Sequence, residues 1–143
     1  MDINTFITRV AGSGGYRGNN SFIQIAQVLR QVIKDMNSSH ILYPKGLYVE
    51  DSIAEVYVFE MDSVMRFTEA SNNINIEFWK YRDIQKLELG TSTRYDHDKK
   101  LSILFLNNDV IKLDSEIDTN IHHSYDFAEK LFELFKRLRS FAS

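Results

Sequence analysis

The side chains that could do chemistry in this sequence gather in a polar stretch near residue 120. Oxygen-bearing residues alternate there, in the order Asp114, Glu116, Asp118 and Asn120. This alternation is typical of the first half of a calcium-binding loop, in which carboxylate and amide oxygens surround the ion. A complete loop also needs a glycine at its sharp turn and a bidentate glutamate at its end, but Thr119 and Tyr125 occupy those positions. We therefore predict a solvated loop and no metal site.

Histidines are the other candidate metal ligands. His122 and His123 are adjacent, so their side chains diverge on regular structure and reach one metal ion with Asp118 only if the loop folds back. A pH-sensitive start of the last helix is an alternative, because positive charge is unfavourable near a helix N-terminus. His97 lies between two aspartates and is interpreted as a surface loop residue.

A glycine-rich loop is the remaining motif with a chemical interpretation. Residues 12–18 hold four of the six glycines and lead toward a helix, as phosphate-binding loops do. Such loops follow a strand or end in Gly-Lys-Ser/Thr, and neither context is present. We interpret this segment as a connector between two helices.

No catalytic residue, cofactor site or metal ligand is predicted. The chain has no cysteine, which excludes disulfides, thiolate nucleophiles, zinc–thiolate sites and iron–sulfur clusters. No serine lies in a nucleophile-elbow pattern, and no carboxylate pair has a pattern specific for hydrolysis. The sequence favours a non-catalytic protein, although catalytic groups can converge from distant positions and an enzyme stays open.

Composition and charge narrow the class of protein. A hydrophobic fraction of 43% in 143 residues predicts one folded domain that buries roughly two thirds of the unfolded chain's surface. The net charge is -3 and the basic residues are scattered, so nucleic-acid binding is not predicted. The sequence shows no leader and no apolar run of ~20 residues, the length that spans a bilayer. We expect a soluble, cytoplasmic protein.

Two N-terminal helices are predicted from the first 40 residues. Residues 3–10 carry apolar side chains at i, i+3, i+4 and i+7, which indicates a short helix that docks by one face. Ser21 and Gln24 have the spacing of a capping box, and the apolar stripe after them predicts a second helix to about residue 37. We expect residues 1–40 to form a helical extension packed on a sheet domain, residues 41–143, within a single folding unit.

From residue 41 the apolar period changes from about 3.6 to 2, which predicts an antiparallel sheet. Seven strands are expected: residues 47–50, 53–60 and 64–69, two strands within 73–92, then 101–106 and 110–114. A tight corner is expected at residues 81–83. Ile84 does not share the alternation of Leu87 and Leu89, which predicts that it belongs to the corner or to a β-bulge.

The end of the chain predicts a hairpin and a helix. Asn107-Asn108 suits a tight turn that needs positive φ. A last helix, capped by Ser124 or a neighbour, is expected to run to about Phe141, with one apolar side and basic residues in its final turns.

Seven short strands closed by one long amphipathic helix resemble the pleckstrin-homology-like (PH-like) fold. The segment FWKYRDIQKLEL, residues 78–89, is similar to bacterial members in which an aromatic-rich strand turns through an Asp-Ile pair into the next strand. The resemblance covers residues 41–141 and implies an α+β fold: a seven-stranded antiparallel PH-like sheet or barrel, closed by the C-terminal helix and preceded by two N-terminal helices. The whole chain also resembles small uncharacterised proteins of Bacillus-type bacteria grouped as a domain of unknown function, which implies no residue-level role.

One activity of PH-like proteins is not carried over. Members that bind phosphoinositides carry Lys and Arg on the first two strands and the loop between them. Residues 50–55 here read EDSIAE, and these carboxylates would repel a phosphorylated headgroup. Phosphoinositide binding is therefore not predicted.

Surplus aromatic residues on the second faces of the strands carry the functional hypothesis. They are Tyr57, Phe59, Trp79 and Tyr81. They are the candidate surface of a non-catalytic module that we predict binds a protein or peptide, or a second copy of the chain. The competing interpretation is structural, because a sheet that is apolar on both faces needs two covers and the N-terminal helices can supply one.

Two further alternatives come from other functional classes. A cone-shaped α+β fold that binds a small ligand, or catalyses a reaction, would have a pocket near Trp79, His97 or His122. Membrane association through the first helix is the other alternative, weakened because Arg9 is its only strong base.

Overall fold

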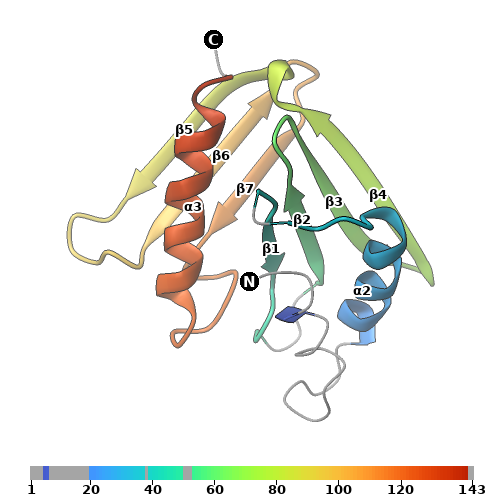
Figure 1. The fold of residues 1–143 in the computed structure, drawn as a ribbon. Coiled ribbons are helices and arrows are strands. Elements are labelled where there is room, and N and C mark those ends of the chain that lie inside the picture. Colours follow the sequence, from blue (N-terminus) through green and yellow to red (C-terminus); the bar gives the residue numbers. More distant parts are fainter. Residues whose placement is uncertain (1–4, 7–19, 38, 50–52, 142–143) are drawn as a thin grey trace. The chain divides into compact units, whose positions relative to one another are not determined.

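The computed structural model describes residues 5–6, 20–37, 39–49 and 53–141 (Figure 1). In chain order its elements are α2 (Asn20–Val32), β1 (Ile41–Lys45), β2 (Glu55–Phe59), β3 (Ser63–Ala70), β4 (Asn73–Lys80), the 3-10 turn η1 (Tyr81–Asp83), β5 (Ile84–Thr91), β6 (Lys99–Phe105), β7 (Val110–Asp114) and α3 (Ser124–Leu138). The chain divides into two compact units, Met1–Phe78 and Trp79–Ser143.

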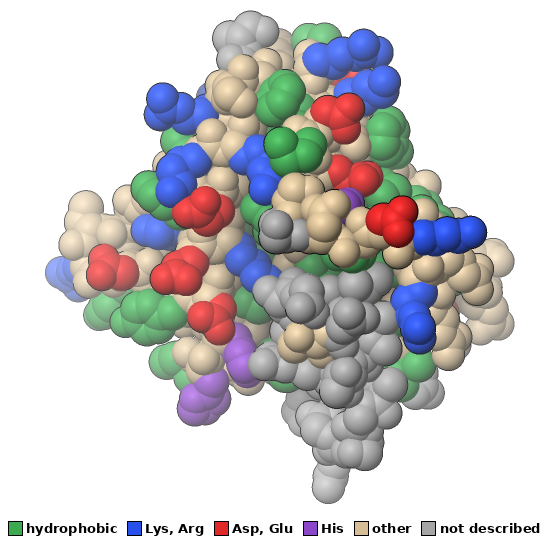
Figure 2. Space-filling model, in the orientation of Figure 1, with side chains coloured by type: hydrophobic (Ala, Val, Ile, Leu, Met, Phe, Trp, Pro, Cys, Tyr) green, Lys and Arg blue, Asp and Glu red, His purple; other side chains and the backbone are tan. Residues whose placement is uncertain are grey.

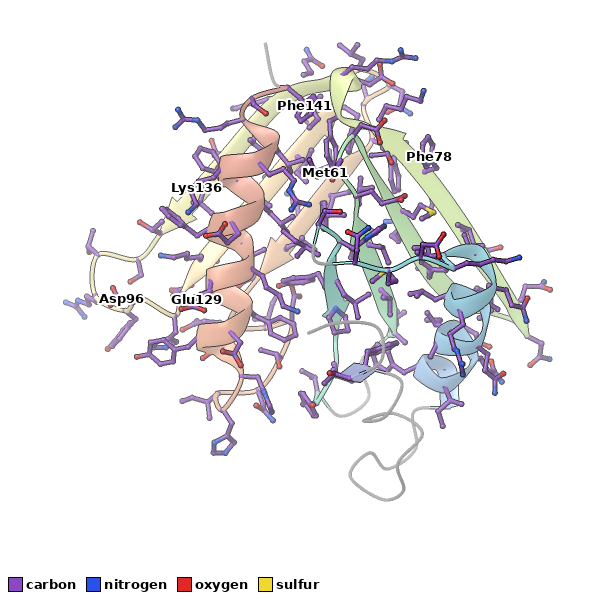
Figure 3. The ribbon with its side chains drawn as sticks, viewed as in Figure 1. Met61, Phe78, Asp96, Glu129, Lys136 and Phe141 are labelled. Carbon is purple, nitrogen blue, oxygen red and sulfur yellow. The ribbon has the colours of Figure 1, made fainter. Side chains whose placement is uncertain are left out.

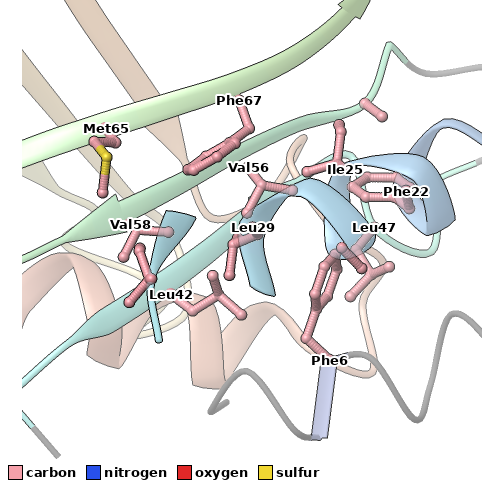
Figure 4. Packing of buried hydrophobic residues seen from close by; sticks show 13 residues of the cluster. Phe6, Phe22, Ile25, Leu29, Leu42, Leu47, Val56, Val58, Met65 and Phe67 are labelled. Atoms are coloured by element: carbon pink, nitrogen blue, oxygen red, sulfur yellow. The ribbon is translucent and has the colours of Figure 1, made fainter. Parts of the chain in front are cut away.

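The first unit is built on an antiparallel sheet with the strand order β1-β2-β3-β4. Apolar residues recur on one face of α2, and this helix contacts β2 and β3. The buried cluster that results is shown in Figure 4: Phe6, Phe22, Ile25, Leu29, Leu42, Leu47, Val56, Val58, Met65 and Phe67. Alternation in the strands follows from this packing, because Val56 and Val58 point into the cluster while Tyr57 and Phe59 point to the other face of the sheet.

A proline in β1 and a tight turn between β3 and β4 shape the strands of the first unit. Pro44 lies inside β1, and it is tolerated there because β1 is at the edge of the sheet, where one side of the strand needs no ladder hydrogen bonds. Ser71 and Asn72 form the two-residue turn between β3 and β4, with φ values of 52 and 66. Positive φ at both positions defines a type I′ hairpin, which matches the twist of the strands it joins.

The second unit holds the antiparallel sheet β5-β6-β7, and α3 packs on β5 and β6 (Figure 1). The predicted irregularity at Ile84 is confirmed: the register shifts between Ile84 and Lys86, so Gln85 is the extra residue of a β-bulge. The predicted positive φ in the β6–β7 turn is also confirmed, because Asn108 has a φ of 73.

The predicted closure of the sheet is wrong. Among the described residues the seven strands form two separate antiparallel sheets, of four and three strands, and not one seven-stranded PH-like sheet or barrel. β4 and β5 follow one another through η1 without pairing, because a 3-10 turn redirects the chain where a hairpin turn would have returned it beside β4. The α+β class is correct.

The predicted helices also need correction. The helices whose bounds lie in the described part of the chain are α2 and α3, so a pair of N-terminal helices is not borne out; before α2, only Thr5 and Phe6 are described as helical. The helix predicted at residues 3–10 lies almost entirely outside the described residues. α2 ends at Val32 rather than near residue 37, and the hydroxyl of Ser21 donates to Oε2 of Glu69 on β3, 3.1 Å away, instead of capping its own helix.

Candidate interaction surface

Two of the four predicted partner residues lie on β2, and both are buried. Tyr57 and Phe59 are 1% and 0% exposed, and their rings stack with centroids 6.2 Å apart. The hydroxyl of Tyr57 donates to Oε2 of Glu55, 2.8 Å away. Burial and the neighbouring Glu55 charge raise the pKa of Tyr57, because both disfavour the phenolate. Tyr57 and Phe59 therefore serve as packing residues in this structure.

The other two predicted partner residues are also buried. Trp79 is 7% exposed, stacks on Phe105 with a centroid distance of 5.6 Å, and donates its indole N–H to Oδ2 of Asp109. Tyr81 is fully buried and its ring contacts Phe141 edge-on at 5.3 Å. None of the four predicted partner residues is therefore exposed in this structure. The proposals below rest on other residues.

Two residues of the alternative pocket, Trp79 and His97, lie far apart in the structure. Trp79 stacks on Phe105, which pairs with Ile84 at one end of the β5–β6 ladder. His97 precedes Lys99, which pairs with Thr91 at the other end. Seven residues of strand separate the two ends, a distance of roughly 23 Å. Trp79 and His97 therefore cannot line one small-ligand pocket.

His97 lies between two exposed tyrosines. Its ring centroid is 5.4 Å from that of Tyr95 and 5.0 Å from that of Tyr125, and its Nε2 is 3.7 Å from Oε1 of Glu116. His122 is exposed. The described residues contain no group of three or more His, Asp or Glu side chains placed to hold a metal ion.

The alternating oxygen-bearing residues before α3 have a structural use. Oδ2 of the buried Asp118 accepts from the backbone N–H of Asp114, 2.6 Å away. Oδ1 of Asp114 accepts from Glu116, and Oδ1 of Asn120 accepts from His122. These side chains satisfy local backbone donors, which explains the pattern without an ion. α3 begins at Ser124, whose Oγ donates to the carbonyl of Ile121, while the N-cap residue is His123.

An exposed apolar strip runs along β4. Ile74 packs against the buried cluster of the first unit, and alternation places Ile76 and Phe78 on the same face of the strand. Ile76 is 43% exposed and Phe78 is 54% exposed. Figure 3 shows Phe78 projecting from β4. The face of this sheet that packs into the core on the other strands is therefore exposed to solvent on β4. We call Ile74, Ile76 and Phe78 the β4 strip.

β4 is also the end of its sheet. In the described part of the chain β3 is its neighbour, and no strand follows it on the other side. In a two-residue hairpin the residues that flank the turn, here Ala70 and Asn73, form a hydrogen-bonded pair, and such pairs alternate along the ladder. The backbone groups of Asn75 and Glu77 consequently point toward β3, and those of the β4 strip point outward. The strip thus combines exposed apolar side chains with an open row of backbone donors and acceptors.

The opposite face of β4 is tied to its neighbours. Nε of Arg66 on β3 donates to Oε1 of Glu77, 2.8 Å away. Arg66 pairs directly with Tyr57 across the β2–β3 ladder. This chain of polar contacts holds β4 in register from the face that the β4 strip does not use, so the open edge is presented by a fixed strand.

The sequence predicts an exposed aromatic surface on the Trp79 face of β4, whereas the exposed apolar residues Ile76 and Phe78 lie on the other face. Alternation separates Ile74, Ile76 and Phe78 from Glu77 and Trp79 correctly, but it does not say which face is covered. Trp79 is covered because Phe105, 26 positions further along the chain, stacks on it. Glu77 shares a face with Trp79, and a charged residue is typical of a solvated face, so the sequence pattern does not identify Trp79 as buried.

Charges on the molecule are mixed. Figure 2 shows acidic side chains interspersed with the Lys and Arg side chains on the face that it presents. No helix in the described part of the chain is long and apolar enough to cross a membrane.

The fold and the β4 strip define a class, a small α+β protein of two antiparallel sheets that exposes an apolar strand edge. The chain belongs to the family described as "Protein of unknown function (DUF3908)", whose model matches residues 2–129. No curated protein and no solved structure matches the chain.

Proposed function

We propose that this protein is a non-catalytic binding module for a protein or peptide partner, and that the partner binds at β4. The observation that carries the proposal is the exposure of Ile76 and Phe78, at 43% and 54%, on the last strand of a sheet. Natural sheets blunt such edges with charges, proline or a covering segment, because an open apolar strand pairs readily with another chain. An edge kept open and apolar is typical of a site for strand addition.

The chemistry of the partner follows from the strand. An added strand takes its affinity from backbone hydrogen bonds to the outward N–H and C=O groups of the β4 strip. Its specificity comes from alternate side chains, which meet Ile76 and Phe78 on one face. We expect an extended segment with apolar residues, aromatic or β-branched, at alternate positions. A cytoplasmic location belongs to the proposal and is supported by the absence of cysteine from the sequence.

A peptide library selected on the wild-type protein tests the proposal. Selected peptides should show apolar residues at every second position, and their affinity should fall by at least about tenfold for the double variant Ile76→Lys, Phe78→Lys. The matched control is Ile117→Lys, Ile121→Lys, which places two charges at exposed apolar positions of the loop before α3 (70% and 76% exposed). The control should leave affinity unchanged.

Two outcomes would contradict the proposal. One is that no peptide is enriched above the level found on the double variant. The other is that selected peptides bind the double variant as well as they bind the wild type, while the fluorescence of Trp79, the only tryptophan, shows that the variant is folded.

A further inference from the structure

We propose that the strand added to β4 is β4 of a second copy of this chain, in an antiparallel pair centred on Ile76. This inference rests on the proposed function, because it uses the same open edge. It goes further by naming the partner and the register. The chain carries on one strand both the open edge and the alternating apolar segment that such an edge accepts.

Backbone geometry leaves few registers for this pair. Outward backbone groups lie on Ile74, Ile76 and Phe78, and in an antiparallel ladder each outward-facing residue must bond one of the other copy. A symmetric pair of this kind can be centred on Ile76 or on Glu77 and still overlap over seven of the eight residues of β4. A symmetric pair centred on a residue nearer either end of β4 would leave more residues of the strand unpaired.

Side-chain chemistry chooses between the two centres. Centred on Ile76, the pair sets Ile76 against Ile76 of the second copy and Ile74 against Phe78. On the other face it sets Asn75 against Glu77, so a carboxylate meets an amide. Centred on Glu77, the pair would set two Glu77 carboxylates directly opposite each other, and like charges at that position are destabilising.

The Glu77 register has a second defect. It would set Ile74 against Lys80, whereas the Ile76 register gives Ile74 an apolar partner on the same face. Aromatic and β-branched pairs across strands are mutually stabilising. Charge and apolar matching therefore favour the same centre.

The pair explains why the β4 strip is exposed in one chain. The two-fold axis of a pair centred on Ile76 is perpendicular to the sheet, so the same face of both sheets lies on the same side. The six side chains of two β4 strips then form one continuous apolar row, on the face where α2 covers the rest of each sheet. Strip residues that are exposed in the monomer gain apolar neighbours from the second copy.

Single cysteines test the register directly, because the chain has none of its own. In the proposed register the two Ile76 Cα atoms are about 5.5 Å apart, within the range of about 4.4–6.8 Å that a disulfide needs. The two Glu77 residues are diagonal neighbours at about 7–8 Å. Mild oxidation of dilute protein should therefore convert Ile76→Cys to a covalent dimer and leave Glu77→Cys mostly monomeric. Ile117→Cys, in an exposed loop, measures random cross-linking.

Sedimentation equilibrium supplies the second measurement and uses no cysteine. Ile76→Ala keeps the outward N–H and shortens the side chain, whereas Ile76→Pro also removes the N–H without touching the β3 ladder. Wild type should show a reversible monomer–dimer equilibrium. Ile76→Pro should raise its dissociation constant at least about tenfold above that of Ile76→Ala.

The outcomes separate the two proposals. A wild-type chain that stays monomeric up to ~1 mM, or a dimer that Ile76→Pro leaves intact, overturns the second-copy inference. Faster cross-linking of Glu77→Cys than of Ile76→Cys overturns the register. If the chain is monomeric while selected peptides still bind at the β4 strip, the proposed function stands and the self-pairing fails. If neither peptides nor a second copy bind there, both fail.

Discussion

The indole N–H of Trp79 donates a hydrogen bond to Oδ2 of Asp109 across 2.9 Å, although 30 positions separate the two residues in sequence. Asp109 also accepts from Nδ2 of Asn107, so one carboxylate oxygen holds both the end of β4 and the β6–β7 turn. These contacts give Trp79 a structural role, and the proposed binding site lies on the other face of β4.

Replacing Trp79 by Phe tests that assignment. Trp79→Phe keeps a ring against Phe105 and loses the hydrogen bond, so the free energy of unfolding should fall by about 1–2 kcal/mol. Urea denaturation followed by circular dichroism measures the change. Leu106→Ala, at a 62% exposed position of the same turn, should change the free energy by less than about 0.5 kcal/mol. A Trp79→Phe variant that loses selected peptides at unchanged stability would restore Trp79 as a contact residue.

Alkaline pH tests the burial of Tyr57. Its pKa is raised in the folded chain, first by burial and then by the Glu55 charge, so the folded state keeps the phenol protonated where the unfolded state ionises. The contribution of Tyr57 to the free energy of unfolding is fully present below the unfolded-state pKa of about 10, and it decreases as the pH rises above that value. Relative to Tyr57→Phe, wild type should lose up to about 1.4 kcal/mol per pH unit between pH ~10 and ~11. The free energy of unfolding, measured in urea, is compared between the two proteins as a function of pH. The same pH dependence in both would contradict a raised pKa of Tyr57.

The β3–β4 turn tests the geometry that opens the β4 edge. Asn72 has a φ of 66, a conformation that glycine adopts without strain and a β-branched residue does not. Asn72→Gly should therefore leave stability unchanged or raise it by a few tenths of a kcal/mol, and Asn72→Val should lower it by about 1–2 kcal/mol. Thermal unfolding measures both. Equal melting temperatures for the two variants would contradict a type I′ turn, and with it the assignment of outward backbone groups to the β4 strip.

The features that the sequence predicted well depend on nearby residues. The bulge at Ile84 follows from broken alternation, and the positive φ of Asn108 follows from its residue type in a short turn. The sequence predicts the first strand at residues 47–50, after Pro44, but β1 spans Ile41–Lys45. In the structure Pro44 lies within β1, at the edge of its sheet, where proline is tolerated.

The features that the sequence did not predict depend on distant residues. Alternation shows that β4 has two different faces, but the partner of each face comes from elsewhere in the chain. Ile74 packs on a cluster that includes Phe22, while Trp79 packs on Phe105. Whether β4 pairs with β5 is likewise decided by the path of the chain through η1. The candidate binding surface could be recognised only once the covered face and the sheet edge were both known.

Hydrogen exchange at β4, followed residue by residue by NMR, tests most directly that its open edge is the binding site. In dilute free protein the amide protons of Ile74, Ile76 and Phe78 should exchange quickly, and those of Asn75 and Glu77 slowly. Saturation with a selected peptide should slow exchange at Ile76 and Phe78 by at least about tenfold. Slow exchange at the β4 strip in dilute free protein, or fast exchange that persists with peptide bound, would contradict binding at this edge.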